Sequence, residues 1–292
     1  MIAAPAPAVP LHPPIGNRSI GAILVDTGRL SLPDAERILA VQQQEGLRFG
    51  EAGLKLGILK TEDIAFALAR QYDYPYLLPG ETAVSTEVIA AHNPFSPQVE
   101  ALRALRSQLM LRWFSGERET HALAIVSPGR GEGRSWLAAN LAVMFSQLGQ
   151  HTLLIDADLR SPRQHTLFGL DNRSGLSSVL ANRAQVDTIR RIGSFVDLSV
   201  LPAGPQPPNP QELVSRPLFA NLLEELSNEF GVIIIDTPAA ADCADAQTIA
   251  TRASGALLLA RKHMTSMEAL AALADNLRQT GVQLVGSTVS NF

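Results

Sequence analysis

The feature that most constrains this sequence is a glycine-rich loop between an apolar run and a helix-forming segment. Residues 122–127 are almost entirely apolar, and residues 127–135 read Ser-Pro-Gly-Arg-Gly-Glu-Gly-Arg-Ser. A helix is predicted over 136–148. Strand, glycine-rich loop and helix form the context of a phosphate-binding loop, because glycines let backbone N–H groups point at phosphate oxygens beside a helix N-terminus. The sequence therefore predicts a phosphate site, with a simple tight turn as the alternative.

The candidate nucleotide-binding residues are those of the loop and of the start of the helix. Ser135 is placed to ligate Mg²⁺, while Gly131, Gly133 and Arg134 are expected to surround the phosphates. The complete predicted nucleotide-binding set is Gly129, Arg130, Gly131, Glu132, Gly133, Arg134, Ser135 and Trp136.

Carboxylates follow two apolar runs. Asp156 and Asp158 end one of them, and Asp236 ends another. The carboxyl ends of parallel strands lie at the edge where open α/β sheets bind ligands. Carboxylates there can hold Mg²⁺ through its waters and activate an attacking hydroxyl. A lone aspartate at such a place is more often a helix cap, but three of them beside a phosphate loop favour a metal site. Ser135, Asp156 and Asp236 are the predicted metal ligands.

Apolar runs alternate with helix-forming segments through the C-terminal two-thirds of the chain. Fully apolar strands between helices indicate a parallel sheet covered on both faces. We therefore predict a doubly wound, mainly parallel α/β P-loop domain over residues 98–292. The predicted strands are residues 122–127, 152–156, 197–201, 232–236, 255–260 and 283–289.

An internal repeat precedes this domain. Residues 21–42 match residues 50–71 after a shift of 29 positions, so that Gly28 meets Gly57. Each copy has the pattern of a short helix, a Gly-Xaa-Leu turn and a longer helix, and two such hairpins form a small all-α domain. The predicted organisation is a Pro/Ala-rich disordered tail over 1–16, the helical repeat over 17–78, a linker over 79–97 and the α/β domain over 98–292.

Composition excludes several classes of protein. The net charge of −4 gives no general attraction to nucleic acid. Cys243 is the only cysteine, so no disulfide forms within the chain. The apolar runs are far shorter than the ~18 residues of a membrane span. We expect a cytoplasmic protein without a nucleic-acid partner that reaches the inner membrane through another protein.

The loop and the two acidic segments resemble the Walker A, A′ and B motifs of bacterial tyrosine kinases associated with capsule and exopolysaccharide export. Residues 156–160 carry the Asp-Xaa-Asp-Xaa-Arg form of the A′ motif. Glu100, Arg103 and Arg106 resemble the Glu-Xaa-Xaa-Arg-Xaa-Xaa-Arg segment through which these kinases assemble into rings, although a solvated helix face has the same pattern. The resemblance covers about residues 94–292.

This resemblance implies an ATP- and Mg²⁺-dependent protein-tyrosine kinase of the autokinase type that regulates exopolysaccharide chain length and export. Its implied partner is a membrane-embedded chain-length determinant protein. Arg134, Asp156 and Asp158 are the implied catalytic residues, with Asp156 as the base for the acceptor hydroxyl and Asp158 supporting the metal shell. Arg134 stands where the family has a lysine, and its planar fork is wider than an ammonium group. A nucleotide-binding regulatory or assembly module with little or no kinase activity therefore stays open as the alternative.

The helical repeat resembles the N-terminal domain of type II secretion and pilus assembly ATPases. That domain docks on a membrane partner and in some members binds cyclic di-GMP through paired arginine motifs. Arg48 and Arg18 stand at positions that differ by one residue between the two copies, so we favour protein docking over cyclic di-GMP. The three tyrosines, Tyr72, Tyr74 and Tyr76, end this domain, and we interpret them as packing residues.

Overall fold

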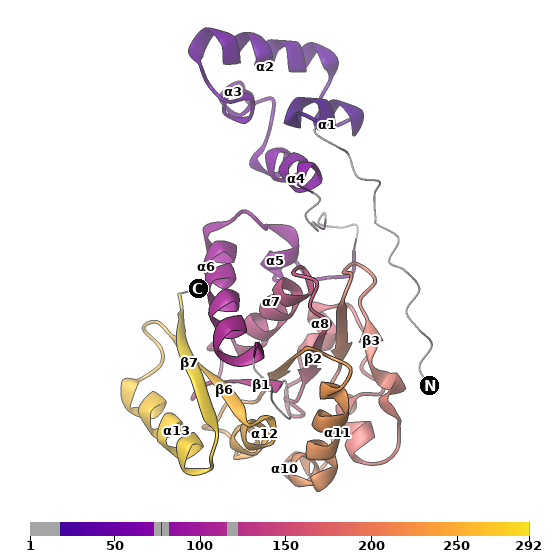
Figure 1. Cartoon of the computed structure of the whole chain (residues 1–292), viewed down its shortest axis with the longest axis vertical. Coiled ribbons are helices and arrows are strands. Elements are labelled where there is room, and N and C mark those ends of the chain that lie inside the picture. Colours follow the sequence, from indigo (N-terminus) through magenta and orange to yellow (C-terminus); the bar gives the residue numbers. More distant parts are fainter. Residues whose placement is uncertain (1–17, 73–76, 78–81, 116–121, 292) are drawn as a thin grey trace. The chain divides into compact units, whose positions relative to one another are not determined.

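The computed structural model describes residues 18–72, 77, 82–115 and 122–291. Contacts divide the chain into two compact units (Figure 1). The N-terminal unit comprises residues up to 78 together with 91–96, and the C-terminal unit comprises residues 79–90 and 97–292. The residues of the predicted linker, 79–97, are thus shared between the two units. The tail predicted over 1–16 lies outside the described residues.

The described part of the N-terminal unit contains the short and long helices of the two repeat copies, α1 (Ile20–Asp26), α2 (Leu32–Glu45), α3 (Phe49–Lys55) and α4 (Thr61–Gln71). They pair across the copies rather than as two separate hairpins: α1 packs mainly on α4, and α2 on α3. Gly28 and Gly57 adopt left-handed conformations, with φ of 71° and 65°, in the two equivalent turns. Glycine takes this conformation without the steric cost of a Cβ atom. Ser31 begins the second helix by accepting a hydrogen bond from the Asp34 N–H at 3.2 Å.

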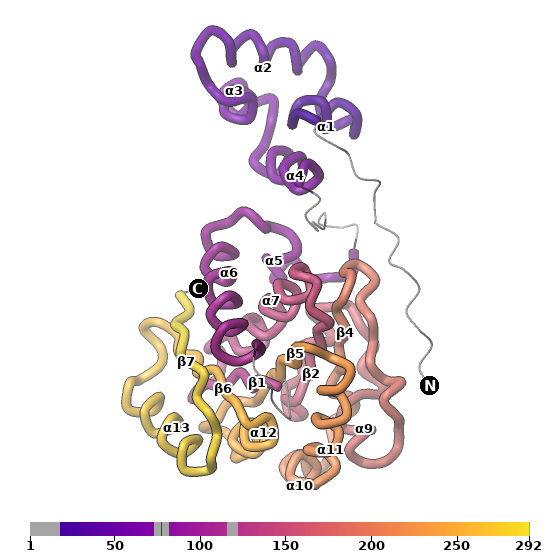
Figure 2. Tube along the Cα trace, in the orientation of Figure 1, coloured from indigo at the N-terminus to yellow at the C-terminus, as the bar shows by residue number. Residues whose placement is uncertain are grey.

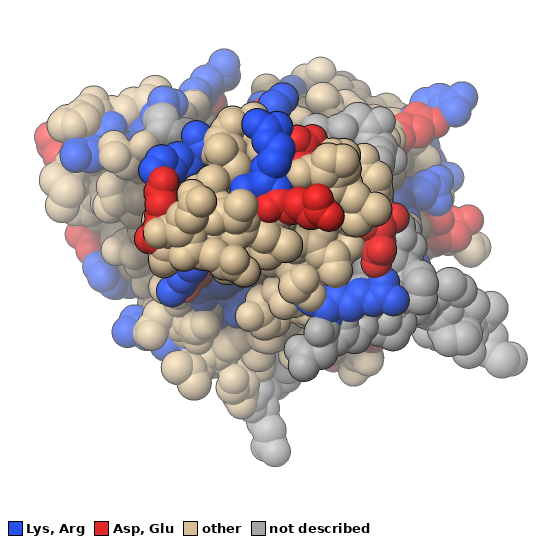
Figure 3. Space-filling model, turned by 90° about the horizontal axis from the view of Figure 1, so that it is seen from above, with Lys and Arg blue, Asp and Glu red and all other residues tan. Residues whose placement is uncertain are grey.

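The core of this unit is small. Ile23, Leu24 and Ile38 are fully buried. On the face seen in Figure 3, basic and acidic side chains are interspersed, as the nearly balanced composition predicts. Tyr72, at the end of α4, is 74% exposed, so its interpretation as a packing residue is wrong. Tyr74 and Tyr76 lie outside the described residues.

The C-terminal unit contains a seven-stranded sheet. Its strand order is β3-β4-β2-β5-β1-β6-β7, and every neighbouring pair is parallel except β3 and β4 (Figures 1 and 2). The predicted mainly parallel α/β fold is confirmed. The strands are β1 (Ala122–Val126), β2 (Thr152–Asp156), β3 (Arg190–Arg191), β4 (Leu198–Leu201), β5 (Val232–Asp236), β6 (Gly255–Arg261) and β7 (Gln283–Ser290).

Helices and helical turns precede and connect these strands. The helices after α4 are α5 (Ile89–His92), which spans the division between the two units, α6 (Pro97–Leu109), α7 (Arg134–Ser146), α8 (Gln164–Leu167), α9 (Leu176–Leu180), α10 (Pro210–Ser215), α11 (Pro217–Ser227), α12 (Asp245–Ala253) and α13 (Met267–Gln279). A π-helical turn, Met110–Phe114, extends α6, and a 3-10 turn, Val186–Thr188, precedes β3. Among the described residues, no helix combines the length and the apolar character that crossing a bilayer requires.

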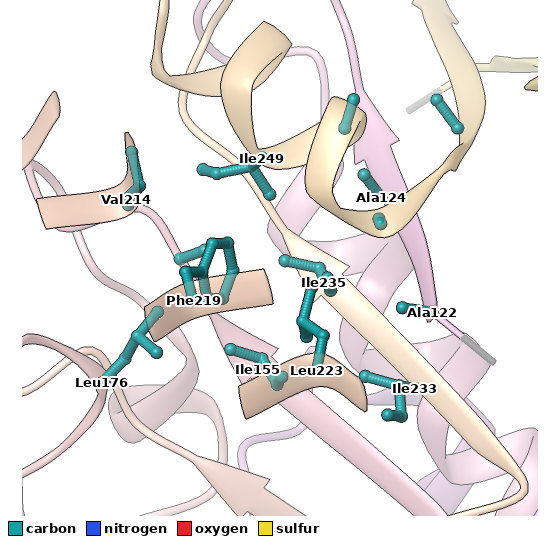
Figure 4. Close-up of a cluster of buried hydrophobic side chains, with 14 of the residues drawn as sticks. Ala122, Ala124, Ile155, Leu176, Val214, Phe219, Leu223, Ile233, Ile235 and Ile249 are labelled. Carbon is teal, nitrogen blue, oxygen red and sulfur yellow. The ribbon is translucent and has the colours of Figure 1, made fainter. Parts of the chain in front are cut away.

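The sheet is covered on both faces, and its central strands are therefore buried along their whole length and apolar except at their ends. Helix α7 contacts β1, β2 and β5 on one face. Alternate residues of the strands point to the opposite face, where they meet α9 to α12. Figure 4 shows this cluster, which includes Ala122, Ala124, Ile155, Leu176, Val214, Phe219, Leu223, Ile233, Ile235 and Ile249. The two-sided burial holds the carboxyl ends of β1, β2 and β5 at one edge of the sheet.

The end of α6 is anchored beside the sheet by Trp113. Its indole Nε1 donates to the Ala122 carbonyl at 3.0 Å. Its ring covers Gly255, where a Cβ atom would lie 2.2 Å from the nearest ring carbon. A glycine is therefore required at the start of β6. Phe114 packs edge-on against Phe145 of α7, with ring centroids 5.1 Å apart.

Candidate nucleotide and metal site

The glycine-rich loop joins β1 to α7 in the conformation that the phosphate-site prediction requires. Gly131 and Gly133 have φ of 70° and 99°, in the left-handed region. The Gly133 carbonyl accepts the first helical hydrogen bond, from the Leu137 N–H at 2.8 Å. The loop therefore ends at a helix N-terminus, where free N–H groups and the helix dipole favour an anion.

Glu132 braces this loop from within the protein. Its carboxylate is buried and accepts hydrogen bonds from the Gly129 N–H at 2.7 Å and the Thr265 hydroxyl at 2.5 Å. Ser290, at the end of β7, donates to the Glu132 carbonyl at 3.2 Å, and Arg261 donates to the Gly131 carbonyl at 2.7 Å. The end of the sheet thus holds the loop at two carbonyl groups and one carboxylate.

Arg134 lies across the base of the loop rather than in solvent. Its Nε donates to the Thr237 carbonyl at 2.9 Å, and its Nη1 donates to the Gly129 carbonyl at 2.5 Å and to the Ser127 hydroxyl. The side chain is buried. Three acceptors therefore fix the guanidinium between the start of the loop and the end of β5.

The other two predicted loop residues with large side chains are less enclosed. Arg130 is exposed and pairs with Asp242 at 2.6 Å, which ties the loop to the segment after β5. Trp136 is half-buried in the first turn of α7, and its carbonyl accepts from the Asn140 side chain at 2.9 Å.

Asp156 and Asp236 occupy paired positions on the neighbouring strands β2 and β5, and both are fully buried. Burial raises the pKa of Asp236 to about 6, against the opposing effect of hydrogen bonds from Ser135 and Gln164. Burial, followed by the charge of Asp236, raises the pKa of Asp156 well above its usual value. Because two neighbouring buried negative charges repel each other, Asp156 and Asp236 favour a bound proton or cation that reduces their charge.

The carboxylate of Asp156 also organises the A′ segment. One oxygen accepts from the Asp158 N–H at 3.3 Å, and the other accepts from the N–H groups of Arg163 and Gln164, both at 2.9 Å. The second oxygen thus holds the start of α8. Asp158 similarly accepts from the N–H groups of Arg160 and Ser161, at 3.1 and 2.9 Å.

Arg160, the last residue of the A′ motif, is held by a buried partner. It donates to both oxygens of Asp245, at the start of α12, with distances of 2.9 and 3.3 Å. The two-pronged contact fixes the outer end of the A′ segment against the helix that follows β5.

Gln164 belongs to the site and sequence reasoning missed it. It is fully buried, and its Nε2 donates to Asp236 at 2.8 Å and to the Ser135 carbonyl at 3.0 Å. Its Oε1 and the Oδ1 of Asp236 are buried without a hydrogen-bond partner. A signal existed in the sequence, since an amide side chain follows the acidic A′ segment within eight residues of Asp156.

These oxygens fit Mg²⁺, which prefers oxygen ligands and keeps several waters. The Asp236 oxygen, the Gln164 oxygen and the Ser135 hydroxyl lie beside the phosphate loop, and a bound cation would offset the charge of the carboxylate pair. Within the described part of the chain, no three His, Cys, Asp or Glu side chains gather into a metal cluster.

No family model matches the chain. Tyrosine-protein kinase YwqD of Bacillus subtilis is 37% identical over 203 residues, which cover 70% of this chain and 85% of that protein. The chain belongs to the family of bacterial tyrosine-protein kinases. The kinase domain of the Escherichia coli tyrosine kinase ETK superposes with a TM-score of 0.66 at 32% identity, covering 70% of this kinase and 79% of that chain. The chimerical protein CapA2B2 superposes with a TM-score of 0.65 at 34% identity, covering 77% and 96%.

The family confirms the predicted P-loop fold and the predicted class of enzyme, a protein-tyrosine kinase. A kinase transfers the γ-phosphoryl group of ATP with Mg²⁺ neutralising the phosphate charge. The predicted cofactors, ATP and Mg²⁺, therefore follow from the family and fit the orphaned oxygens of the site.

Proposed function

We propose that this kinase phosphorylates tyrosine with Ser135 and Asp236 holding Mg²⁺ and the glycine-rich loop holding the phosphates. The observation that carries the proposal is the pair of buried, unpartnered oxygens of Asp236 and Gln164 beside that loop. In this arrangement the tyrosine oxygen bonds to the γ-phosphorus, the bond from that phosphorus to the bridging oxygen breaks, and ADP leaves. The tyrosine proton passes to Asp156, the carboxylate that we assign as the base. Asp158 supports the water shell of the metal.

The biological setting that we propose is the control of exopolysaccharide chain length and export. The resemblance of the three nucleotide motifs to those of exopolysaccharide kinases supports this setting, with a membrane-embedded chain-length determinant protein as partner. The helical repeat would provide a docking domain for a protein at the inner membrane. Cyclic di-GMP remains the less favoured ligand of that repeat, because its arginines differ in position.

The alternative is a nucleotide-binding assembly module that transfers phosphate poorly. The observation that favours it is Arg134, whose guanidinium already has three acceptors within the protein. Those contacts compete with any reach toward the γ-phosphate.

Radiolabelled ATP with the purified full chain separates these functions. We expect Mg²⁺-dependent labelling of tyrosine, low with the protein alone and higher with a chain-length determinant partner, because related kinases are completed by such a segment. Phosphoamino-acid analysis is the measurement, and Asp236→Asn is the inactive control. ATP binding without phosphotyrosine under both conditions would establish the assembly module, and the absence of Mg²⁺-dependent binding would exclude both functions.

Self-association through α6 is a further part of this proposal. Glu100 and Arg103 pair within the helix at 2.7 Å, whereas Arg106 is partly turned inward and donates to the Met144 carbonyl at 3.2 Å. Glu100, whose side chain is 72% exposed, is therefore the charge best placed to meet a neighbouring subunit, and Arg103, 22% exposed, stands beside it.

Swapping these two charges should dissociate the assembly without unfolding the kinase. Glu100→Arg with Arg103→Glu keeps the ion pair within the helix but reverses the charges offered to a neighbour. We expect light scattering to show a smaller species, because exposed pairs contribute ~0.2–1 kcal/mol each and act together across a repeated interface. The same swap at Asp275 and Arg278, an exposed pair of equal spacing on α13, is the matched control. If the first variant has the same mass as the wild type, this face of α6 is a solvated helix face and not an interface.

A further inference from the structure

Residues 82–90 form a strap across the C-terminal unit, although the sequence predicts a linker there. Val84 and Val88 are buried. The Ser85 N–H donates to the Leu167 carbonyl at the end of α8, at 2.8 Å. Ala83 lies so close to Gly169 that a Cβ atom on this glycine would come within 2.4 Å of the Ala83 side chain. The strap is thus packed against the residues that follow the A′ segment.

Asn140 binds the strap through its main chain. This side chain is fully buried in α7, the helix that begins at the phosphate loop. Its Oδ1 accepts from the Ala90 N–H at 2.9 Å, and its Nδ2 donates to the Glu87 carbonyl at 3.3 Å. Gln147, which follows the last residue of α7, donates to the Ala90 carbonyl at 3.1 Å. These contacts hold the backbone of the strap in one register on α7.

The side chain of Glu87 connects this fixed backbone to the metal site. Both of its oxygens accept from Nη2 of Arg163, at 2.8 and 2.7 Å. The main-chain N–H of Arg163 donates to Asp156, and the next residue, Gln164, donates its N–H to Asp156 and its amide to Asp236. Arg163 therefore links the strap directly to Asp156, one of the two buried carboxylates.

We propose that Glu87 is a positioning residue of the kinase site, acting through Arg163 on Asp156 and Gln164. In this arrangement, the strap sets the start of α8 so that the Gln164 amide oxygen and the Asp236 carboxylate face the same metal position. This inference rests on the proposed function, because it concerns how Mg²⁺ and nucleotide are held there. It assigns the segment between the helical repeat and α6 a role within the nucleotide site.

Removing the negative charge of Glu87 in the full chain tests the proposal. For Glu87→Gln, we expect the Mg²⁺ concentration that half-saturates nucleotide binding to rise roughly three- to fivefold, since a two-oxygen contact to arginine is lost. In the metal-free protein, amide hydrogen exchange of Arg163 and Gln164 should accelerate by a similar factor. The melting temperature should stay unchanged, because both partners of the pair are about half exposed. Asp275→Asn, which breaks the exposed pair with Arg278, is the matched control and should alter none of these quantities.

Reversing the pair separates positioning from a general loss of structure. Arg163→Glu alone should reproduce the loss, and Arg163→Glu combined with Glu87→Arg should restore most of the Mg²⁺ affinity. The proposal is wrong if Glu87→Gln behaves like the control, or if its melting temperature falls and the reversed pair gives no rescue. If the wild-type chain fails to bind nucleotide with Mg²⁺, the proposed function is wrong. If the wild type binds and Glu87→Gln binds with the same Mg²⁺ dependence, only the role of Glu87 is wrong.

Discussion

Asp236→Asn is expected to abolish Mg²⁺-dependent nucleotide binding and, in the ligand-free protein, to raise the melting temperature. The asparagine still accepts the Gln164 hydrogen bond at 2.8 Å but carries no charge into a fully buried site. Loss of a metal-binding carboxylate should weaken Mg²⁺-nucleotide binding by roughly 100-fold or more. The pKa of the native group, about 6 against an ordinary 3.8, corresponds to a folding penalty of ~3 kcal/mol at neutral pH.

The pH dependence of this gain has a definite sign. Between the ordinary pKa of 3.8 and the folded value of about 6, the folded protein keeps a proton that the unfolded chain has lost. Wild-type stability from this group therefore falls as the pH rises through that window, and the penalty is complete above it. The advantage of the asparagine variant should be absent below about pH 4 and full above about pH 6. In the wild type, Mg²⁺ affinity should weaken as the pH falls through 6, since the ion competes with the proton.

Calorimetry of nucleotide binding and thermal unfolding from pH 4 to 8 are the measurements. Asp171→Asn is the control of opposite sign, because Arg173 lowers the pKa of that exposed carboxyl and its removal brings no stabilisation. Unchanged affinity in Asp236→Asn would show that the metal lies elsewhere. A lower melting temperature at neutral pH would show that the buried carboxylate is compensated in the ligand-free protein.

Arg134→Ala is expected to cost both stability and nucleotide affinity. The change removes the arginine donor from the buried Thr237 carbonyl and the Ser127 hydroxyl, and leaves the partly buried Gly129 carbonyl to the Ser127 hydroxyl at 3.5 Å. Buried polar groups left unpaired destabilise by ~1–3 kcal/mol each. We expect a loss of ~2–4 kcal/mol after relaxation, and nucleotide affinity should fall with the loop. Denaturant unfolding and calorimetry measure the two effects. Arg130→Ala, which removes an exposed arginine from the same loop, should leave the stability nearly unchanged.

Arg134→Lys tests whether the loop requires only a positive charge at this position or the planar guanidinium group itself. Lysine keeps the charge on a narrower group that suits the path to the γ-phosphate, so phosphotransfer should be retained or should rise. Single-turnover transfer from radiolabelled ATP is the measurement. Lower transfer by the lysine variant would mean that the loop is built around the three contacts of the arginine, and the interpretation of Arg134 as a weakened substitute for lysine would be wrong.

Much of this fold can be predicted from the sequence because short-range patterns of apolar residues and glycines determine its strands and its loop. Apolar runs between helices are sufficient to place β1, β2 and β5 in a parallel sheet, and parallel strands bring their carboxyl ends to one edge. That rule places Asp156 and Asp236 at the same edge of the sheet, whereas their adjacency depends on the strand order, in which β2 lies beside β5. Gly131 and Gly133 likewise need a conformation that few other residues adopt.

The remainder depends on contacts between distant residues. Glu132 meets Thr265, and Asn140 meets Ala90, across intervals that no local pattern spans. A weaker signal did exist for Asn140, since it is the only residue with an amide side chain in α7, an otherwise largely apolar helix. A polar group on such a helix requires a buried partner. The sequence does not say that the partner is the main chain of a segment that otherwise has the composition of a linker.

The strap has a consequence for how the two units communicate. Residues of the N-terminal unit, up to 78 and again over 91–96, flank it covalently on both sides. Thermodynamic linkage is reciprocal, so a strap that strengthens nucleotide binding is itself held more firmly, by the same factor, when nucleotide is bound. A protein that binds the N-terminal unit and prefers one state of the strap would then bind with an affinity that depends on the nucleotide. Such a partner would sense the nucleotide state of the kinase without touching the nucleotide site.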